Sequence, residues 1–259
     1  MTTLRDHDHL THLDVDFFEL LVLDDDVSEL EELLAKDDRC AIVHAPEKMF
    51  IDGRRQLIDL ADEDAQRREM FVSRVNEIAT MAGRLGVPTV VHPGGVRERP
   101  ADGAPLFENL RASLSSMDGT LWLENMPRRY HVDGEKWYCN LCTRPDEIKR
   151  LLPHIDGVCL DISHAYLSVE QGGNAAIASF FEMLRKSIKH VHLSDAAQPD
   201  GEGLQLGDGD VDLTSLPGMR SIPVLLEIWG GHLDDGAGFA EALRRVRRSG
   251  IWFKGCISR

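Results

Sequence analysis

Short apolar runs alternate with longer amphipathic segments along the chain. In the clearest amphipathic segment, residues 64–85, apolar side chains recur with the 3.6-residue period of a helix, and Gly86 and Pro88 supply a stop. Strand-like runs followed by helical segments, repeated throughout, predict a parallel sheet covered by helices. The apolar runs cover residues 17–23, 40–44, 87–92, 120–124, 157–161, 190–193 and 223–228.

Two of the predicted helices carry a start signal. Ser28 and Glu31 form a capping box, and Pro145 followed by two acidic residues suits the first turn of a helix. No linker or low-complexity tract interrupts the pattern, so a single domain over residues 1–259 is the simplest division.

Seven strand and helix units, without a glycine-rich dinucleotide fingerprint after the first strand, favour a TIM (β/α)8-type barrel over an open doubly wound sheet. The count is one strand short of eight. Residues 1–16 are too polar for a full β-α unit, so we expect this first unit to be missing and the segment to be flexible. Residues 251–257 are apolar, and we expect them to close the barrel between the strands at 223–228 and 17–23.

Polar residues stand where the predicted strands end, which is the most informative feature of the sequence. Alternate residues of a strand share a face, so all of these side chains point into the barrel if the preceding apolar residues face the helices. They then converge at the carboxyl end of the strands, where barrel enzymes build active sites. The residues are His44, His92, Glu124, Asp161, His192 and Glu227.

Three carboxylates buried close together would cost several kcal/mol per charge without compensation, so a cation is expected among them. Histidine interleaved with Asp and Glu, with no thiolate at the strand ends, suits a divalent ion such as Mn²⁺, Zn²⁺, Co²⁺ or Mg²⁺.

The charge of the chain argues against a nucleic-acid partner. It has 44 Asp and Glu against 29 Lys and Arg, a formal net charge of −15, whereas binding to phosphates relies on Lys and Arg. No segment approaches the roughly 20 apolar residues of a membrane span. Five scattered cysteines indicate a reducing compartment, so a cytoplasmic protein is expected, and the pair Cys139 and Cys142 is interpreted as two loop thiols.

The strand-end motifs, in chain order, resemble those of the xylose-isomerase-like TIM barrels. This superfamily contains sugar isomerases and epimerases, related dehydratases and the endonuclease IV DNA-repair enzymes. The motifs are Val91-His92-Pro93-Gly94, Trp122-Leu123-Glu124-Asn125, Cys159-Leu160-Asp161-Ile162-Ser163-His164, Val191-His192-Leu193-Ser194-Asp195, Leu206-Gly207-Asp208-Gly209 and Leu226-Glu227.

The resemblance implies roles for individual residues. One divalent ion would be held by the shared metal tetrad, and His44 and His92 match two ligands of a second ion in the nuclease branch. A substrate would contact His164, His92, His44 and Trp122. The tetrad is Glu124, Asp161, His192 and Glu227.

The chain departs from the nuclease branch at one motif. The nucleases complete a third zinc site with Asp-x-His, where this chain has Gly201-Glu202-Gly203, and neither glycine can ligate a metal. A trinuclear cluster is therefore incomplete.

The resemblance and the departure together imply a metal-dependent isomerase or epimerase of a small sugar, sugar phosphate or polyol, acting through an enediolate, with Glu124 and Glu227 exchanging protons with the substrate. Three alternatives stay open: a metal-dependent phosphoesterase related to the abasic-site endonucleases, a dehydratase on a sugar-like substrate, and a non-catalytic sugar-binding barrel. Members of the family often dimerise, so a homodimer is compatible with the resemblance.

Several other features have more than one interpretation. The segment 127–142 is long and aromatic, which suits either a substrate lid or a packing and dimer-contact loop. Lys48 and Arg97 follow strand ends and are either phosphate contacts or solvated surface. A surface position is expected for His7, His9 and His12, and a hydrogen-bonded interior position for His190.

Overall fold

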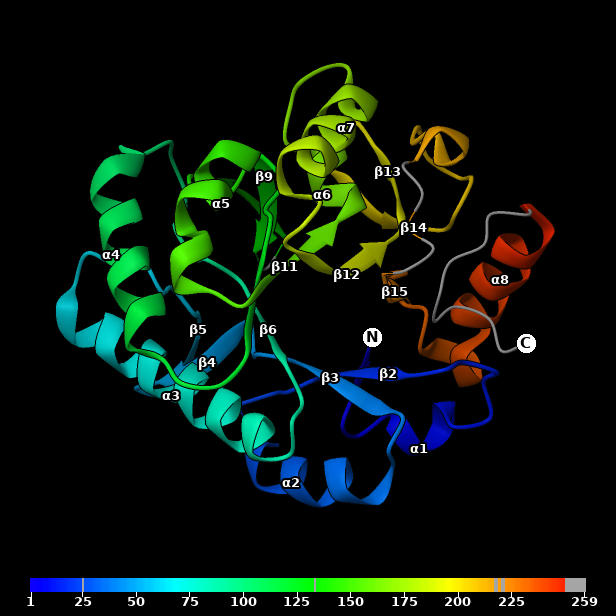
Figure 1. The fold of residues 1–259 in the computed structure, drawn as a ribbon, viewed down its shortest axis with the longest axis horizontal. Helices are drawn as coiled ribbons and strands as arrows, with labels where there is room; N and C mark the ends of the chain where they lie inside the picture. Colours follow the sequence, from blue (N-terminus) through cyan, green and yellow to red (C-terminus); the bar gives the residue numbers. More distant parts are fainter. Residues whose placement is uncertain (25, 133, 217–218, 220–221, 250–259) are drawn as a thin grey trace.

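The structure is a computed structural model that describes residues 1–259 except 25, 133, 217–218, 220–221 and 250–259. Its centre is an eight-stranded sheet in which each strand pairs in parallel with the strands before and after it in sheet order. The sheet curls, and helices line its outside (Figure 1), which confirms the predicted TIM-type α/β architecture. The strands are β1 (Thr2–Thr3), β2 (Phe18–Leu21), β3 (Cys40–His44), β6 (Thr89–Val91), β8 (Leu121–Glu124), β11 (Gly157–Asp161), β12 (Ile188–Leu193) and β15 (Val224–Leu226).

The helices follow the strands as the sequence pattern predicts, with one difference in a cap. In the helix predicted over 64–85, the Asp64 side chain accepts from two backbone N–H groups of the first turn. The capping box at Ser28 is wrong, because Ser28 lies inside the helix and Asp26 precedes it; Arg5 binds the Asp26 carboxylate instead. The helices are α1 (His7–Leu10), α2 (Val27–Lys36), α3 (Ala65–Arg84), α4 (Gly103–Ser116), α5 (Pro145–Leu151), α6 (Ile162–Leu167), α7 (Gly173–Leu184) and α8 (Leu233–Ser249).

The amino-terminal segment supplies the first β-α unit, so the expectation that residues 1–16 lack one is wrong. Thr2 and Thr3 pair with Leu20 and Leu21 of β2, and the amino group of Met1 lies 3.4 Å from the carbonyl oxygen of Leu226 in β15. A two-residue strand needs little apolar sequence, and three buried leucines, Leu4, Leu10 and Leu13, anchor the segment. The segment predicted to close the barrel, residues 251–257, lies outside the described residues.

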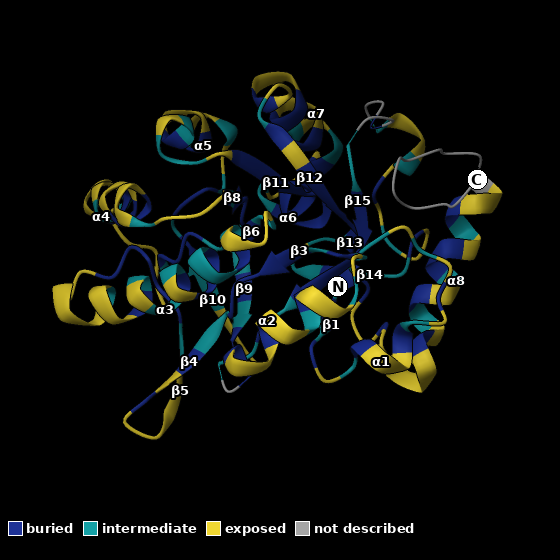
Figure 2. Cartoon of the chain, turned by 60° about the horizontal axis from the view of Figure 1, so that its bottom comes forward, coloured by how far each residue is buried: buried dark blue, intermediate teal, exposed yellow. Residues whose placement is uncertain are grey.

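Side chains of the sheet separate into two apolar layers. Val43, Val91, Leu123, Leu160, Val191 and Leu226 pack into the large core that the helices share. A small second cluster, inside the curl of the sheet, joins Ile42, Val90 and Cys159 with Phe17 and Trp122. The predicted alternation of faces along the strands is therefore confirmed. In Figure 2 the strands of the eight-stranded sheet are mostly buried and the outer helix surfaces are exposed.

Three additional small sheets extend from the loops. The segment 127–142, predicted as a lid or packing loop, forms a hairpin of β9 (Arg129–Val132) and β10 (Glu135–Cys139), to which β7 (Val96–Arg97) adds a strand. The other two are the hairpin of β4 (Lys48–Ile51) with β5 (Arg54–Leu57) and that of β13 (Asp195–Ala197) with β14 (Gly201–Leu204).

Within the described part of the chain, no helix combines the length and the apolar character that crossing a bilayer requires.

Candidate metal centre

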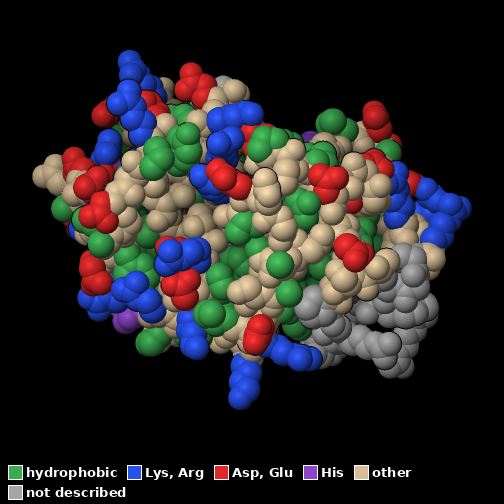
Figure 3. Space-filling model, turned by 90° about the horizontal axis from the view of Figure 1, so that it is seen from above, with side chains coloured by type: hydrophobic (Ala, Val, Ile, Leu, Met, Phe, Trp, Pro, Cys, Tyr) green, Lys and Arg blue, Asp and Glu red, His purple; other side chains and the backbone are tan. Residues whose placement is uncertain are grey.

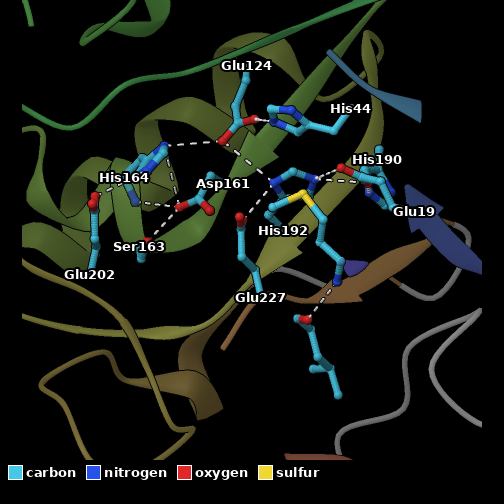
Figure 4. A network of polar contacts seen from close by, with 12 residues as sticks. Glu19, His44, Glu124, Asp161, Ser163, His164, His190, His192, Glu202 and Glu227 are labelled. Atoms are coloured by element: carbon cyan, nitrogen blue, oxygen red, sulfur yellow. Dashed lines mark hydrogen bonds and ion pairs between the residues drawn. The ribbon is translucent and has the colours of Figure 1, made fainter. Parts of the chain in front are cut away.

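Four of the predicted residues meet at the carboxyl end of the sheet (Figure 4). Each offers one ligand atom, and these atoms all lie within 4.8 Å of one another. Two ligands bound about 2.1 Å from one ion lie roughly 3–4 Å apart, so the spacing approaches that of a coordination sphere. The four are Glu124, Asp161, His192 and Glu227, at or next to the ends of β8, β11, β12 and β15.

The ring of His192 divides its nitrogens between two sets of carboxylates. Its Nε2 lies 3.0 Å from an oxygen of Glu19, while its Nδ1 lies 2.9 Å from Glu227 Oε2 and 3.6 Å from Glu124 Oε1. Neither His192 Nδ1 nor Glu227 Oε2 has a hydrogen-bond partner among the described residues, although both atoms are buried. Buried polar atoms that point at one another without bonding fit a shared cation, so this donor set is suited to a divalent metal.

Glu19 is one of two residues of the candidate site that the sequence analysis missed. It is fully buried in β2, and its Oε2 lies 2.7 Å from His190 Nε2 and 3.1 Å from His192 Nε2. A carboxylate behind a metal-binding histidine fixes the orientation of the ring and leaves the other nitrogen for the ion. Glu19 stands inside the apolar run 17–23 rather than at its end, and a charged residue in such a run was the available signal.

A side-chain amide sets the position of Asp161. Asn125 accepts from the backbone N–H of Asp161 at 2.8 Å and donates to its carbonyl at 3.0 Å. The Asp161 carboxylate in turn accepts from the Ser163 hydroxyl at 2.8 Å and from the backbone N–H of His164 at 2.5 Å. The strand end that carries Asp161 is therefore fixed against β8 by the residue that follows Glu124.

The predicted residues for a second ion also come together. The Nε2 atoms of His44 and His92 lie 3.3 Å and 3.4 Å from Glu124 Oε2, and the three residues form a compact ligand group. His44 donates from Nδ1 to the carbonyl of Ala45 at 2.8 Å, which leaves its Nε2 for the site. Glu124 therefore lies between this pair of histidines and the tetrad.

Histidines and carboxylates compensate one another at this site. Burial alone would raise the pKa of Glu124 and Glu227, but His192 outweighs it, so the pKa of Glu124 lies well below its usual range and that of Glu227 is about 2. Burial would lower the pKa of His44, but Glu124 raises it to about 9. Both glutamates are therefore ionised at neutral pH.

Asp161 behaves differently from the two glutamates. Burial raises its pKa to about 7, the charge of His164 opposes this rise, and the charges of Glu227 and Glu124 add to it. Asp161 is thus the carboxylate of the three whose negative charge its surroundings stabilise least, and a bound cation would stabilise it.

His164 faces the same site from α6. Its Nδ1 lies 2.9 Å from the carbonyl oxygen of Asn125 and 3.3 Å from Glu124 Oε1, and its Nε2 lies 3.3 Å from Glu202 Oε2. Glu202 is buried, and the ring of Tyr130 packs edge-on to His164. The sequence analysis considered the two glycines around Glu202 as lost ligands and missed that Glu202 itself enters the site.

Other predicted residues lie elsewhere. Trp122 sits one layer deeper in the barrel, with its ring 5.9 Å from that of His190, so the structure does not bring it to the four ligands. Arg97 forms an ion pair with Asp59. His190 is a hydrogen-bonded interior residue, as predicted.

The amino-terminal histidines separate into two kinds. His9 and His12 are exposed, as predicted, but His7 is only 2% exposed, so a surface position is wrong for it. Its ring packs edge-on against Phe18, which gives this otherwise polar segment an apolar contact. Cys139 and Cys142 are both buried free thiols.

Comparisons with known proteins identify the fold and the family of the chain. No curated protein sequence matches the chain. Among solved structures, D-allulose 3-epimerase from Methylomonas sp. in complex with D-allulose is similar at a TM-score of 0.63 and 15% identity, with 94% of this chain and 88% of that chain covered. A xylose isomerase domain protein from Planctomyces limnophilus has a TM-score of 0.61 and 16% identity, with 96% of both chains covered.

Endonuclease IV from Thermus thermophilus is also similar, at a TM-score of 0.59 and 19% identity, with 89% of this chain and 88% of that chain covered. These likenesses show the fold. The family model for the xylose isomerase-like TIM barrel matches residues 8–249, and the chain therefore belongs to that family.

Proposed function

We propose that the protein is a divalent-metal-dependent isomerase or epimerase of a small sugar or related polyol. The observation that carries this proposal is the convergence of Glu124, Asp161, His192 and Glu227 within 4.8 Å, with two of them, Glu124 and Glu227, on strands three places apart in the sheet. Such a pair of carboxylates can approach a substrate from two sides.

The two glutamates would move the protons. Both are ionised because His192 stabilises their negative charge, so each can accept a proton from a substrate carbon. A bound divalent cation would polarise the substrate carbonyl and offset the negative charge that develops next to it. His164, held by Asn125 and Glu202, would orient a substrate hydroxyl.

The hairpins over the site would exclude water. Lys136 of β10 forms an ion pair with Asp200, in the turn of the β13–β14 hairpin, and His131 lies 3.7 Å from the same carboxylate. Tyr130 of β9 is buried and lies edge-on to His92. A closed cover of this kind would protect a reactive carbanion from solvent.

One observation favours a second candidate, a two-metal phosphoesterase: His44 and His92 gather on Glu124 as ligands of a second ion. Two features favour the sugar enzyme instead. The buried Glu202 carboxylate beside His164 would repel a phosphodiester. On the face shown in Figure 3, Lys and Arg side chains stand among Asp and Glu rather than in a continuous basic surface.

Solvent deuterium exchange tests the proposal. The manganese-loaded protein, incubated in D₂O with a panel of aldoses and ketoses, should introduce deuterium next to the carbonyl of at least one sugar, as followed by NMR. Glu124→Gln and Glu227→Gln should slow exchange by about 10²–10⁴-fold, because each removes a base. Glu108→Gln, an exposed residue of α4, is the matched control.

The product pattern separates the alternatives. Loss of water from the sugar would indicate a dehydratase. Cleavage of an abasic-site duplex, with no exchange on any sugar, would contradict the proposal and favour the phosphoesterase. Sugar binding with neither exchange nor cleavage would indicate a non-catalytic barrel.

A further inference from the structure

A second group of metal-ligand side chains lies at the opposite end of the barrel from the tetrad. His7 comes from α1, Asp37 from the turn between α2 and β3, and Cys40 is the first residue of β3. Their ligand atoms all lie within 4.8 Å of one another. His7 and Cys40 are 2% and 3% exposed, and the Asp37 side chain is 15% exposed. The cluster is therefore buried, with one edge open to solvent.

Two distances in this cluster match those between the ligands of a tetrahedral zinc ion. His7 Nε2 lies 3.4 Å from Cys40 Sγ and 3.3 Å from Asp37 Oδ2. Ligands of a tetrahedral zinc ion, bound at about 2.0–2.3 Å, lie roughly 3.3–3.6 Å apart. A single proton on Nε2 can be donated well to only one of these two neighbours, whereas a cation would contact all three atoms at once.

The groups behind the three ligands also fit a metal site. Arg39 donates to both carboxylate oxygens of Asp37, at 3.1 Å and 2.8 Å. The second ring nitrogen of His7, Nδ1, has no hydrogen-bond partner among the described residues and lies 3.5 Å from a carboxylate oxygen of Asp8. A carboxylate behind the ligating histidine and a donor behind the ligating carboxylate are the usual outer contacts of a protein-bound metal.

The charges of the ligands indicate which ion would bind. The Asp37 carboxylate already forms an ion pair with Arg39, so a Cys40 thiolate would supply the remaining negative charge, and a thiolate selects a soft or borderline ion.

We propose that His7, Asp37 and Cys40 form a structural zinc site, separate from the metal centre at the carboxyl end of the barrel. An ion bound there ties α1 to the first residue of β3. It thereby adds a link to the first β-α unit, which otherwise depends on the three buried leucines Leu4, Leu10 and Leu13. The site stabilises the fold and takes no part in the proton transfer.

Cobalt substitution tests the site directly on the full chain. The protein is stripped with a chelator and titrated with Co²⁺, and a near-ultraviolet sulfur-to-cobalt charge-transfer band reports a thiolate ligand. The band should appear in the unmodified protein and disappear in Cys40→Ala. Cys159→Ala and Cys256→Ser are the controls, and both should retain it. Zinc content after dialysis should fall by one equivalent in Cys40→Ala only.

Two results would overturn the proposal: absence of a thiolate band in the unmodified protein, or a band of full intensity in Cys40→Ala. If Cys40→Ala does not fold, as judged by circular dichroism, Asp37→Asn replaces it. This variant keeps the volume of the side chain and should lower zinc affinity at least about tenfold. Unchanged zinc affinity in a folded Asp37→Asn protein would count against the site.

Discussion

Two layers inside the barrel are built from the same strands but contain opposite chemistry. The layer at the carboxyl end consists of His44, His92, Glu124, Asp161 and His192, whereas the layer two residues deeper consists of Ile42, Val90, Trp122, Cys159 and His190. Residues two apart on a strand point to the same face, so both layers face the interior of the barrel and lie one above the other. The candidate metal centre therefore takes one residue from each of these strands in the layer at the carboxyl end, called the upper layer below, and His164 and Glu202 join it from outside the eight-stranded sheet. The deeper layer gives these residues a mainly apolar base.

One pair of residues breaks this separation. His190 is polar but lies in the deeper layer, and Glu19 contacts both it and His192. Glu19 thus connects the layers, and burial lowers the pKa of His190, so that His190 presents a neutral ring to Glu19. The deeper layer therefore helps to orient His192 through Glu19, in addition to filling the interior of the barrel.

Loss of the metal held by the tetrad should have the largest effect on deuterium exchange. Dialysis against a chelator should reduce sugar deuterium exchange to the background rate, because the charge that compensates Glu124, Asp161 and Glu227 is lost. Added Mn²⁺ should restore exchange. Full exchange in protein shown by mass spectrometry to be metal-free would contradict the assignment.

A cavity in the deeper layer should lower the stability of the fold and leave the metal site largely unchanged. Ile42 is 3% exposed, and Ile42→Ala should lower the free energy of unfolding by about 2–5 kcal/mol, as measured by urea denaturation. Metal affinity at the upper layer, measured by calorimetry at a temperature where the variant is folded, should change little. Equal losses of stability and metal affinity would show that the layers are not separable.

Replacement of the connecting carboxylate should have an intermediate effect. Glu19→Gln keeps the size of the side chain but weakens its hold on His192, so metal affinity should fall by about 10–100-fold. Calorimetric titration with Mn²⁺ measures this change, and Glu108→Gln serves as the control. Unchanged affinity would mean that the orientation of His192 is fixed by packing alone.

The smallest effect is expected at Trp122. Since its ring lies in the deeper layer next to His190, Trp122→Phe should leave the KM for the sugar unchanged. A large rise in KM with normal stability would show that Trp122 contacts the substrate, as the family resemblance implied.

The sequence predicted the upper layer well because periodicity and strand ends are local signals. Each tetrad residue stands at or near the end of an apolar run, so its face and height in the barrel could be inferred without long-range information. Glu19 could not be placed in the same way, since its partner His190 is 171 residues away and only the curl of the sheet brings them together. Glu202 lies on a hairpin, whose course over the site follows from no periodic pattern.

The first β-α unit escaped prediction for a different reason. Its strand has two residues and is defined by pairing with β2 rather than by an apolar run. His7 and Cys40 belong to different elements and are 33 residues apart in the sequence, so spacing along the chain does not indicate their contact.

Asn125 links the ends of two neighbouring strands through its side chain. Its amide takes the place of a backbone rung between β8 and the end of β11, since the paired residues of these strands end at Cys159 and Glu124. The separation of the Glu124 and Asp161 carboxylates thus depends on the length of the Asn125 side chain. Substitution of Asn125 during evolution could change the distance between these two carboxylates, while every strand of the sheet keeps its register.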